Sequence, residues 1–310
     1  MLRDIYGYRF FAVCLKRDNA LYAGIPVADV RSRITGRRWV SLPFSDHCRP
    51  LVPRDDSAAT DRLVGYLKAQ QGSATPRIEL RWDIASSHSL YRTSDFVSHL
   101  LEFAGNNKAT LFKMFNQQAQ RSIRKSEKEG VVVKACTTYA EFELFYRLQV
   151  MTRRRLGVPA QPRLFFRGVW DYMIMPGFGI ALLAFKDDTP IGGGVFFKFK
   201  DTMVYKYGAS DLKYKAYQPN YAYMWSGIQR ALDDGCVRFD FGRSDKRNDG
   251  LRRFKLGWGT QEHELAYTVL ADREPAFGPS KLEGIVGTVI RNSPEIVCKL
   301  SGELLYKHFA

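Results

Sequence analysis

The alternation of apolar and polar residues is clearest after residue 116. Residues Gln117–Gly130 are typical of a charged helix that ends at a glycine, and the β-branched run Val131–Cys136 predicts a strand directly after it. Helical spacing of apolar residues then continues through Tyr139–Leu156 and Pro162–Met173. This part of the chain therefore begins with a helix, a strand and two further helices.

Three strands joined by short polar turns are predicted next. They are Ile180–Lys186, Ile191–Lys198 and Thr202–Ser210. Turns of this length join antiparallel neighbours, so the three strands form a meander. The apolar period of Asn220–Asp234 predicts a helix that Asn220 can cap. A strand, a short helix and a strand follow at Val237–Phe241, Gly250–Trp258 and Glu264–Leu270.

The first 120 or so residues predict a mixed α/β unit. Short β-rich runs occur at Phe10–Leu15, Trp39–Leu42 and Arg77–Trp82, and Ala58–Gln71 has helical spacing.

The chain from Lys281 predicts two helices broken at Ser293-Pro294. They either pack on the parent domain or lie on a membrane surface, with Lys299 and Lys307 at their flanks.

Composition narrows the class of protein. Of 310 residues 45% are hydrophobic, which excludes a disordered tail, and 47 Lys and Arg against 32 Asp and Glu give a net charge of +15. This charge indicates either a polyanionic partner or a charged surface that only aids solubility. Five scattered cysteines without a CxxC pair, and the lack of a signal-peptide pattern or a long apolar run, favour a cytoplasmic protein that contacts a membrane peripherally at most.

Five motifs occur in order along the chain. They are RSIRKSEKEG (121–130), YKYGAS (205–210), PN (219–220) followed by Trp225, FDFGRS (239–244) and GLRRFKLGWG (250–259). Together with the predicted order of elements they resemble the FemAB-like branch of the GNAT acyltransferase superfamily, the peptidyltransferase-type proteins of peptidoglycan cross-bridge formation. SLPFSDHCRPL (41–51) is similar to a segment of the first domain of these proteins.

This resemblance implies an α+β fold with two tandem GNAT-like domains, at residues 1–125 and 126–272, and C-terminal helices over 273–310 that pack on the first domain or on a membrane. In such a fold an antiparallel meander splays from the next, parallel strand and leaves a cleft for the acyl donor. The activity implied is transfer of an acyl or aminoacyl group, from aminoacyl-tRNA or acyl-CoA, to an amine of a cell-wall or envelope polysaccharide precursor. The location implied is the cytoplasm or the inner face of the membrane.

One departure bears on the donor. Acetyl-CoA enzymes of this superfamily carry a glycine-rich loop before the helix that follows the meander, because clustered N–H groups hold the pyrophosphate. Here that loop is GASDLKYKAYQPN (208–220), with one glycine and several bulky residues. FemAB-like enzymes that use aminoacyl-tRNA also lack this loop, so the resemblance implies aminoacyl-tRNA rather than acetyl-CoA as the donor, and no tightly bound cofactor is expected. His263 has no partner histidines at metal-binding spacing, so no metal site is predicted.

Three residues are candidates for catalysis. Asp240 lies between two phenylalanines on the strand that would form one wall of the cleft, and it either orients the attacking amine or plays a structural role in the following turn. Lys255 either stabilises an oxyanion or a phosphate, or extends over Trp258. Tyr207 either protonates the leaving oxygen or packs in the core.

Further residues are candidates for binding. The substrate-binding candidates are Arg243, Ser244, Asn220, Tyr217, Trp225, Arg252 and Arg253. Arg121, Arg124, Lys125 and Lys128 share one face of a helix, where they either contact a polyanion or form a solvated surface. Glycines 192–194 interrupt a strand, at a bulge or where an extended acceptor adds to a sheet edge.

Two alternative functions stay open. One is a non-catalytic protein that binds RNA or a membrane surface and retains the fold with a degenerate cleft. The other is an N-acetyltransferase that uses acyl-CoA. The sequence leaves the oligomeric state open.

Overall fold

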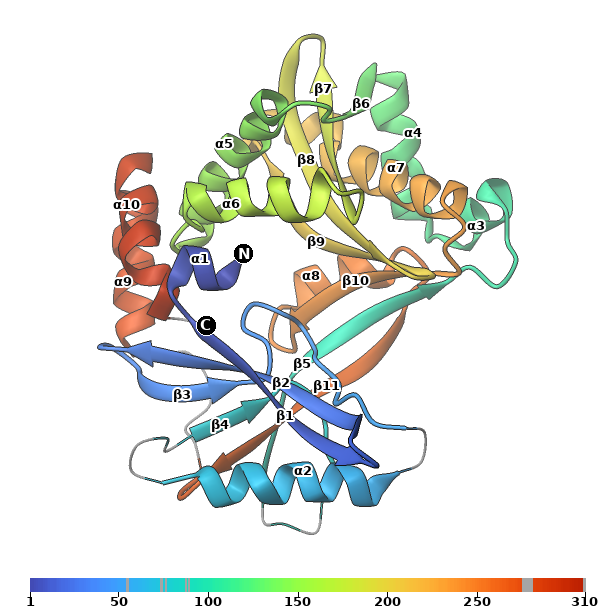
Figure 1. The fold of residues 1–310 in the computed structure, drawn as a ribbon. Helices are drawn as coiled ribbons and strands as arrows, with labels where there is room; N and C mark the ends of the chain where they lie inside the picture. The colour runs from blue at the N-terminus through green and yellow to red at the C-terminus, as the bar shows by residue number, and fades with distance from the viewer. Residues whose placement is uncertain are drawn as a thin grey trace. The chain divides into compact units, whose positions relative to one another are not determined.

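The computed structural model describes residues 1–53, 56–72, 75, 77–86, 88, 90–274 and 281–308 (Figure 1). Tertiary contacts divide the chain into two compact units. The central unit contains Ser98–His263 and the C-terminal helices as far as Leu304. The N-terminal unit contains Leu2–Val97, the chain from Glu264 onward in the last strand, and the described residues after Leu304.

The central unit is built on a mixed sheet. Its strands are β5 (Tyr91–Glu102) from Ser98 onward, β6 (Val131–Ala135), β7 (Gly179–Lys186), β8 (Thr189–Phe199), β9 (Thr202–Ser210) and β10 (Arg238–Asp245). The hydrogen-bonded order is β5-β10-β9-β8-β7-β6, with antiparallel pairing from β6 to β9 and parallel pairing of β10 with β9. The predicted meander and the parallel strand that follows it are therefore confirmed.

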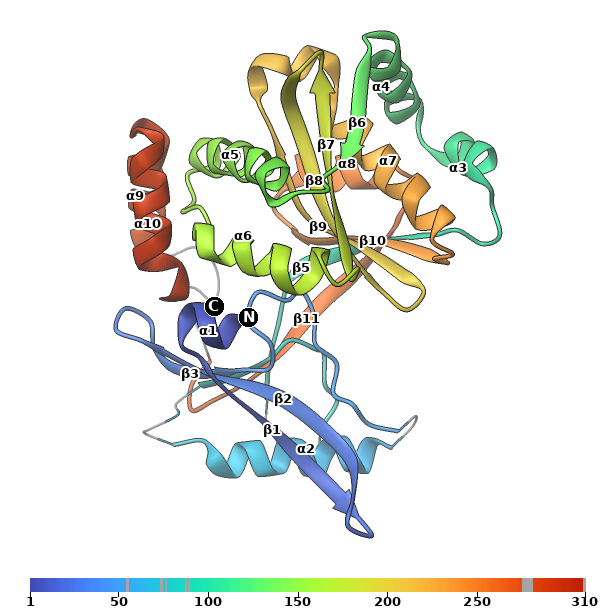
Figure 2. The same ribbon diagram turned by 45° about the horizontal axis from the view of Figure 1, so that its top comes forward.

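Helices cover both faces of this sheet (Figure 2). They are α3 (Lys108–Met114), α4 (Gln117–Lys128), α5 (Tyr139–Leu156), α6 (Arg163–Val169), α7 (Pro219–Asp233) and α8 (Asp249–Leu256). Helices α3, α4 and α7 enclose a core with β10, in which Phe115, Trp225 and Phe239 are buried. Because α3 and α4 belong to this core, the change of unit falls near residue 97, and the predicted boundary after residue 125 lies inside α4.

Local signals explain where these helices begin and end. Thr138 and Glu141 form a capping box at the start of α5, and Gly157 takes a left-handed conformation at its end. The predicted helix Pro162–Met173 is instead α6 followed by a π-helical turn, Trp170–Ile174. Helix α7 begins after Gln218, which has a positive φ of 58°, so the predicted cap at Asn220 is wrong.

The three glycines at 192–194 lie inside the sheet rather than at an edge. Strand β8 pairs with β7 on one side and β9 on the other, so no extended acceptor can add to it. A Cβ at Gly193 would lie 2.7 Å from the carbonyl oxygen of Leu182, and one at Gly194 would lie 2.8 Å from the ring of Tyr223. Close packing explains these glycines, and the prediction of an edge site for an acceptor is wrong.

The N-terminal unit contains the other strands of the chain and two helices. Its elements are α1 (Leu2–Tyr6), β1 (Arg9–Arg17), β2 (Ala20–Ser32), β3 (Gly36–Val40), α2 (Ser57–Gln70), β4 (Arg77–Leu80) and β11 (Gln261–Ala271). The strand order is β1-β2-β3-β4-β11. The predicted strands and the predicted helix correspond to β1, β3, β4 and α2. Together the two units give the predicted α+β class.

The C-terminal helices are α9 (Lys281–Asn292) and α10 (Glu295–Leu305), broken at Ser293-Pro294 as predicted, before a 3₁₀ turn at Tyr306–His308. Both helices pack in the central unit, where α9 contacts α5 and Ala160 N donates to Cys298 O (3.3 Å). The 3₁₀ turn packs in the N-terminal unit, where Tyr8 Oη donates to Lys307 O (2.6 Å). In the part of the chain that the structure describes, no helix is long and apolar enough to cross a membrane.

Gly302 holds α10 close to the backbone of the central unit. A Cβ at this position would lie 1.7 Å from the carbonyl oxygen of Ala160, so α10 would have to shift. We expect Gly302→Ala to lower the free energy of unfolding by about 2–3 kcal/mol. Gly284→Ala is the matched control, because Gly284 is also helical and a Cβ there meets nothing within 4 Å; it should stabilise the protein by about 0.5–1 kcal/mol. Urea denaturation of both variants measures the difference, and equal effects would contradict the packing argument.

Candidate active site

Strands β9 and β10 pair over a short stretch and then separate. Their parallel register runs from Arg238↔Thr202 to Asp240↔Val204. Beyond it, β9 continues to Ser210 and β10 to Asp245 without pairing to each other. This is the splay between the meander and the next strand that the resemblance implies.

Asp240 stands where the two strands separate. Its side chain is buried, with 8% exposed, and Oδ1 accepts a hydrogen bond from Gly242 N at 2.7 Å. Gly242 has a positive φ of 69°, which favours glycine, so the carboxylate stabilises a bend in β10. Phe239 and Phe241 lie in the core on the opposite side, as the alternation predicts. Asp240 therefore stabilises the backbone of β10, and it does so at the place where the separating strands would receive a substrate.

Lys255 fixes the same bend from helix α8. Its side chain is 2% exposed, and Nζ donates to Gly242 O (2.8 Å) and Arg243 O (3.1 Å). The ammonium of Lys255 is buried and held by two carbonyls, so Lys255 does not extend over Trp258 to solvent, which was the alternative. The result is a positive charge at a fixed position beside the splayed end of β10.

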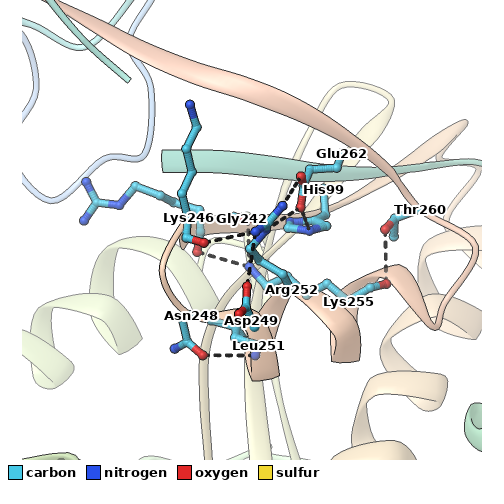
Figure 3. Close-up of polar contacts among 11 residues, drawn as sticks. His99, Gly242, Lys246, Asn248, Asp249, Leu251, Arg252, Lys255, Thr260 and Glu262 are labelled. Atoms are coloured by element: carbon cyan, nitrogen blue, oxygen red, sulfur yellow. Dashed lines mark hydrogen bonds and ion pairs between the residues drawn. The ribbon is translucent and has the colours of Figure 1, made fainter. Parts of the chain in front are cut away.

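Arg252, on the same helix, is held by an ion pair (Figure 3). Nε and Nη2 donate to the two carboxylate oxygens of Glu262 at 2.9 and 2.8 Å, and Nη1 donates to Lys246 O at 3.0 Å. This bidentate arrangement uses the guanidinium within the protein, so Arg252 orders α8 against β11. The contact does not support its prediction as a substrate ligand. Arg253 and Arg243 are exposed.

His99, which the sequence reasoning missed, completes this group (Figure 3). It is fully buried on β5, with Nε2 3.0 Å from Glu262 Oε2. Burial, together with the positive charge of Lys255, lowers the pKa of His99 to about 4, so the imidazole is neutral at pH 7. The hydrogen bonds from Arg252 lower the pKa of Glu262. No local motif marks His99, because its partners lie more than 150 residues away in the sequence.

His99 should make stability depend on pH. Its pKa in the folded protein lies below its ordinary value of 6.5, so its contribution is complete above pH 6.5 and is lost as the pH falls toward 4. The lowered pKa of Glu262 acts in the same direction below pH 4.5. Thermal unfolding between pH 7 and 4 should therefore show a smaller decrease in Tm for His99→Gln than for the wild type. His263→Gln, at an exposed position, is the control, and an unchanged slope in His99→Gln would contradict this assignment.

Tyr207 and Ser244 lie on the same side of the sheet as Asp240. For Tyr207 this follows from a register shift in the pairing of β8 with β9, where Lys206 is an extra residue of β9, so that Tyr207 faces away from the side of Tyr205. For Ser244 it follows from alternation along β10, since Phe239 and Phe241 belong to the core side. Tyr207 contacts the rings of Phe165 and Phe166 in T-shaped arrangements. The structure thus brings three candidates to one face, at the segments where β9 and β10 have separated.

Ser244 is notable for its hydroxyl. The residue is 2% exposed, and Oγ has no hydrogen-bond partner among the described residues. A buried hydroxyl without a partner costs free energy, which is typical of a position that a ligand or water satisfies. Ser244 stays a prediction as a binding residue.

The remaining binding candidates lie around the start of α7. Trp225 is buried against Phe112 and Phe115, so it packs in the core rather than facing a substrate. Asn220 is exposed in the first turn of α7, and Tyr217 lies in the 3₁₀ turn Leu212–Tyr217, where Lys186 Nζ stands 5.8 Å from its ring centroid.

The loop before α7 offers a poor cradle for a pyrophosphate. Pro219 occupies the first position of the helix and has no N–H, and it is buried against β8, where a Cβ on Gly192 would lie 2.8 Å from Pro219 Cβ. The donors of Tyr221 and Ala222 are used by Gln218 O. The identity of the acyl donor stays a prediction.

The basic stripe, Arg121, Arg124, Lys125 and Lys128, is exposed along α4. The opposite face of the helix is buried against α7 through Ala119, Ile123 and two serines. Among the described residues no carboxylate lies within ion-pair distance of the four cations. The stripe is therefore an uncompensated positive surface. The described residues also contain no cluster of metal ligands.

Comparisons with known proteins agree with this architecture. Residues 113–264 match the family model described as "Acetyltransferase (GNAT) domain". No curated protein matches the sequence significantly.

Solved structures extend the likeness to both units. The chain is similar to FemX, with a TM-score of 0.68, 14% identity and coverage of 86% of this chain and 89% of that one. It is also similar to the C-terminal domain of a putative lysylphosphatidylglycerol synthetase from Agrobacterium fabrum (TM-score 0.55, 14% identity, 80% and 81% covered). A tandem GNAT protein from the clavulanic acid pathway gives a TM-score of 0.52 at 8% identity, with 88% and 85% covered. At these identities the likeness concerns the fold, and at that level the predicted resemblance to FemAB-like proteins and the predicted GNAT-like α+β class are confirmed.

Proposed function

We propose that this protein transfers an activated acyl or aminoacyl group to an amine of a cell-wall or envelope polysaccharide precursor. The observation that carries the proposal is the splay between β9 and β10, with Asp240, Tyr207 and Ser244 on one face and the fixed charge of Lys255 beside it. The fold shared with FemX and with a putative lysylphosphatidylglycerol synthetase supports this reaction class.

The proposed reaction is aminolysis of an ester. The amine nitrogen attacks the carbonyl carbon, a C–N bond forms, and the bond from that carbon to the leaving oxygen breaks. Asp240 accepts the proton that the amine loses, and Tyr207 supplies a proton to the leaving oxygen. Lys255 stabilises the negative charge on the carbonyl oxygen, because its ammonium is already held in place and need not reorganise.

We further propose that the donor is aminoacyl-tRNA rather than acyl-CoA. Pro219 has no N–H, and the N–H groups of Tyr221 and Ala222 already donate to Gln218 O, so few backbone donors are left to hold a pyrophosphate. The basic stripe on α4 offers four exposed cations for RNA phosphates. We place this transfer reaction at the cytoplasmic side of the envelope.

Transfer assays test the proposal directly. The purified protein is incubated with a radiolabelled lipid-linked peptidoglycan precursor and, separately, with charged tRNA, acetyl-CoA or a longer acyl-CoA. Transfer from charged tRNA supports the proposal in full, and transfer from acyl-CoA alone keeps the reaction but replaces the donor. No transfer from any donor, together with tight RNA binding, would favour the non-catalytic alternative.

The basic stripe gives a separate prediction. We expect Arg121→Glu with Lys125→Glu to weaken tRNA binding by about tenfold or more at low salt, and to reduce the slope of log Kd against log salt by about two. The control is Lys299→Glu with Lys307→Glu, which changes the net charge equally outside α4. Filter binding at several salt concentrations measures both, and equal slopes in the two double variants would remove the stripe from the binding site.

A further inference from the structure

Strand β1 leaves one edge of the N-terminal sheet without a partner strand. It is the first strand in the order β1-β2-β3-β4-β11, and in the described part of the chain it pairs only with β2. Nine residues, Arg9–Arg17, form this edge, and most of them are exposed. A long exposed edge is a template on which another chain can pair, and proteins normally shield it.

The register shows which backbone groups face outward. Cys14 lies opposite Gly24, and Gly24 exchanges both of its hydrogen bonds with Leu51, at 2.8 and 2.9 Å, on the side away from β1. Opposite residues of an antiparallel pair point their backbone groups either toward each other or apart, so those of Cys14 point away from β2. By alternation, the N–H and C=O groups of Phe10 and Ala12 also point to the free edge, since the register shift comes only after Leu15.

An apolar groove runs beside this edge. It has a volume of about 430 Å³ and lies between β1 and α2, lined by side chains that include Phe11, Val13, Trp39 and Tyr66. Phe11 and Tyr66 are 36% and 54% exposed, and the rings of Phe11 and Trp39 meet edge to face at 4.9 Å. A strand added at the edge would place alternate side chains in the groove, while its backbone pairs with Phe10, Ala12 and Cys14.

The charges around the edge select the occupant. Arg9 lies at one end of β1, and Lys16 and Arg17 lie at the other, all exposed. Among the described residues, Arg9 and Lys16 have no carboxylate within ion-pair distance. A second copy paired antiparallel about Val13 would set Arg9 against Arg17, which is unfavourable. An added strand with acidic ends would instead meet a cation at each end.

We propose that β1 and the groove bind an extended peptide segment of another protein, with an alternating apolar run between acidic residues, by β-strand addition. The backbone of β1 supplies affinity without regard to sequence, and the groove and the terminal cations supply the selection. This surface lies wholly in the N-terminal unit, so it is separate from the splay of β9 and β10.

The test uses a fluorescent synthetic peptide, Asp-Glu-Val-Thr-Val-Thr-Val-Glu-Asp, and fluorescence anisotropy with the full chain. We expect Phe11→Ala to weaken binding by about tenfold or more, because it removes a groove side chain. Phe10→Ala is the matched control, since Phe10 is the neighbouring residue with 40% exposure and lies on the other face of β1. It should change Kd by less than about twofold. Equal effects of the two substitutions would contradict the proposal that the peptide's side chains occupy the groove.

Two further arms test the backbone and the charge. Ala12→Pro removes an N–H donor that points to the free edge of β1. N-methylation of alternate amides removes the matching donors of the peptide. The second change leaves the protein intact, so the test stands even if the Ala12→Pro variant fails to fold. Both should abolish binding, and a peptide with lysines in place of its acids should bind at least about tenfold more weakly. The proposal is overturned by no binding, by equal binding of both peptides, or by a wild-type dimer that Ala12→Pro dissociates in sedimentation, which would assign the edge to a second copy.

Discussion

The Lys255→Met variant is expected to lose transfer activity by roughly 100- to 1000-fold and to unfold at lower denaturant concentration. The ammonium satisfies the buried carbonyls of Gly242 and Arg243, and methionine fills a similar volume without any donor. Leaving both acceptors unsatisfied should cost about 2–4 kcal/mol of stability. The loss of activity has a second cause, because the positive charge beside the splay is removed. Urea unfolding and steady-state kinetics measure the two effects.

The two causes can be separated. Lys255→Arg keeps a positive charge and donors in the same place, and it should recover part of the stability while its larger head group misplaces the charge. Lys113→Met, at an exposed position on α3, is the control and should change neither quantity appreciably. If Lys255→Met loses stability but retains kcat at a temperature where it is folded, Lys255 serves the bend in β10 alone.

Much of the central unit could be predicted from local patterns. The meander and β10 were found because short turns and β-branched runs act over a few residues. Helix α4 was found because a charged repeat ends at Gly130, which has a positive φ of 72°. Alternation alone placed Asp240 on the side opposite Phe239 and Phe241, and the structure agrees.

The misses have tertiary causes. Strand β2 contains Gly24 and Pro26, which locally disfavour a strand, yet Gly24 is paired on both sides, with Cys14 and with Leu51. Helix α7 begins after Gln218 in a left-handed conformation, which no common cap motif signals.

In the candidate site, too, local patterns identified residues, whereas their contacts depend on the tertiary structure. The sequence identified Asp240 and Lys255 but not what they contact, because Lys255 reaches carbonyls of β10 that the end of pairing with β9 exposes. Trp225 and Arg252 were assigned to substrate by residue type, and tertiary packing uses them within the protein. His99 became visible only in three dimensions, and so did the contacts of Tyr205 in the core on the opposite side of the sheet. Burial raises the pKa of Tyr205 to about 12, and its hydroxyl lies 3.2 Å from that of Tyr223, where a Cβ on Gly208 could not fit.

The Asp240→Asn variant is expected to fold like the wild type and to lose kcat by about 100-fold or more, with little change in KM. In the wild type, Gly242 N lies 2.7 Å from Asp240 Oδ1. The Oδ1 of asparagine can accept the same hydrogen bond, so the bend in β10 should persist. It cannot accept the proton of the attacking amine, and loss of a general base typically costs a factor of about 10²–10⁴. Single-turnover transfer assays and thermal unfolding measure these two properties in the same preparation.

Asp240→Ala provides the comparison that makes this result decisive. Alanine removes both the base and the acceptor for Gly242 N, so it should lower kcat and also destabilise the protein by about 1–2 kcal/mol. A purely structural carboxylate gives a different pattern, in which Asp240→Asn retains wild-type kcat and only Asp240→Ala is impaired, in proportion to its loss of stability. That pattern would mean that another group on the same face of the sheet is the base. Ser244, with its buried hydroxyl, would then keep only a role in binding the substrate.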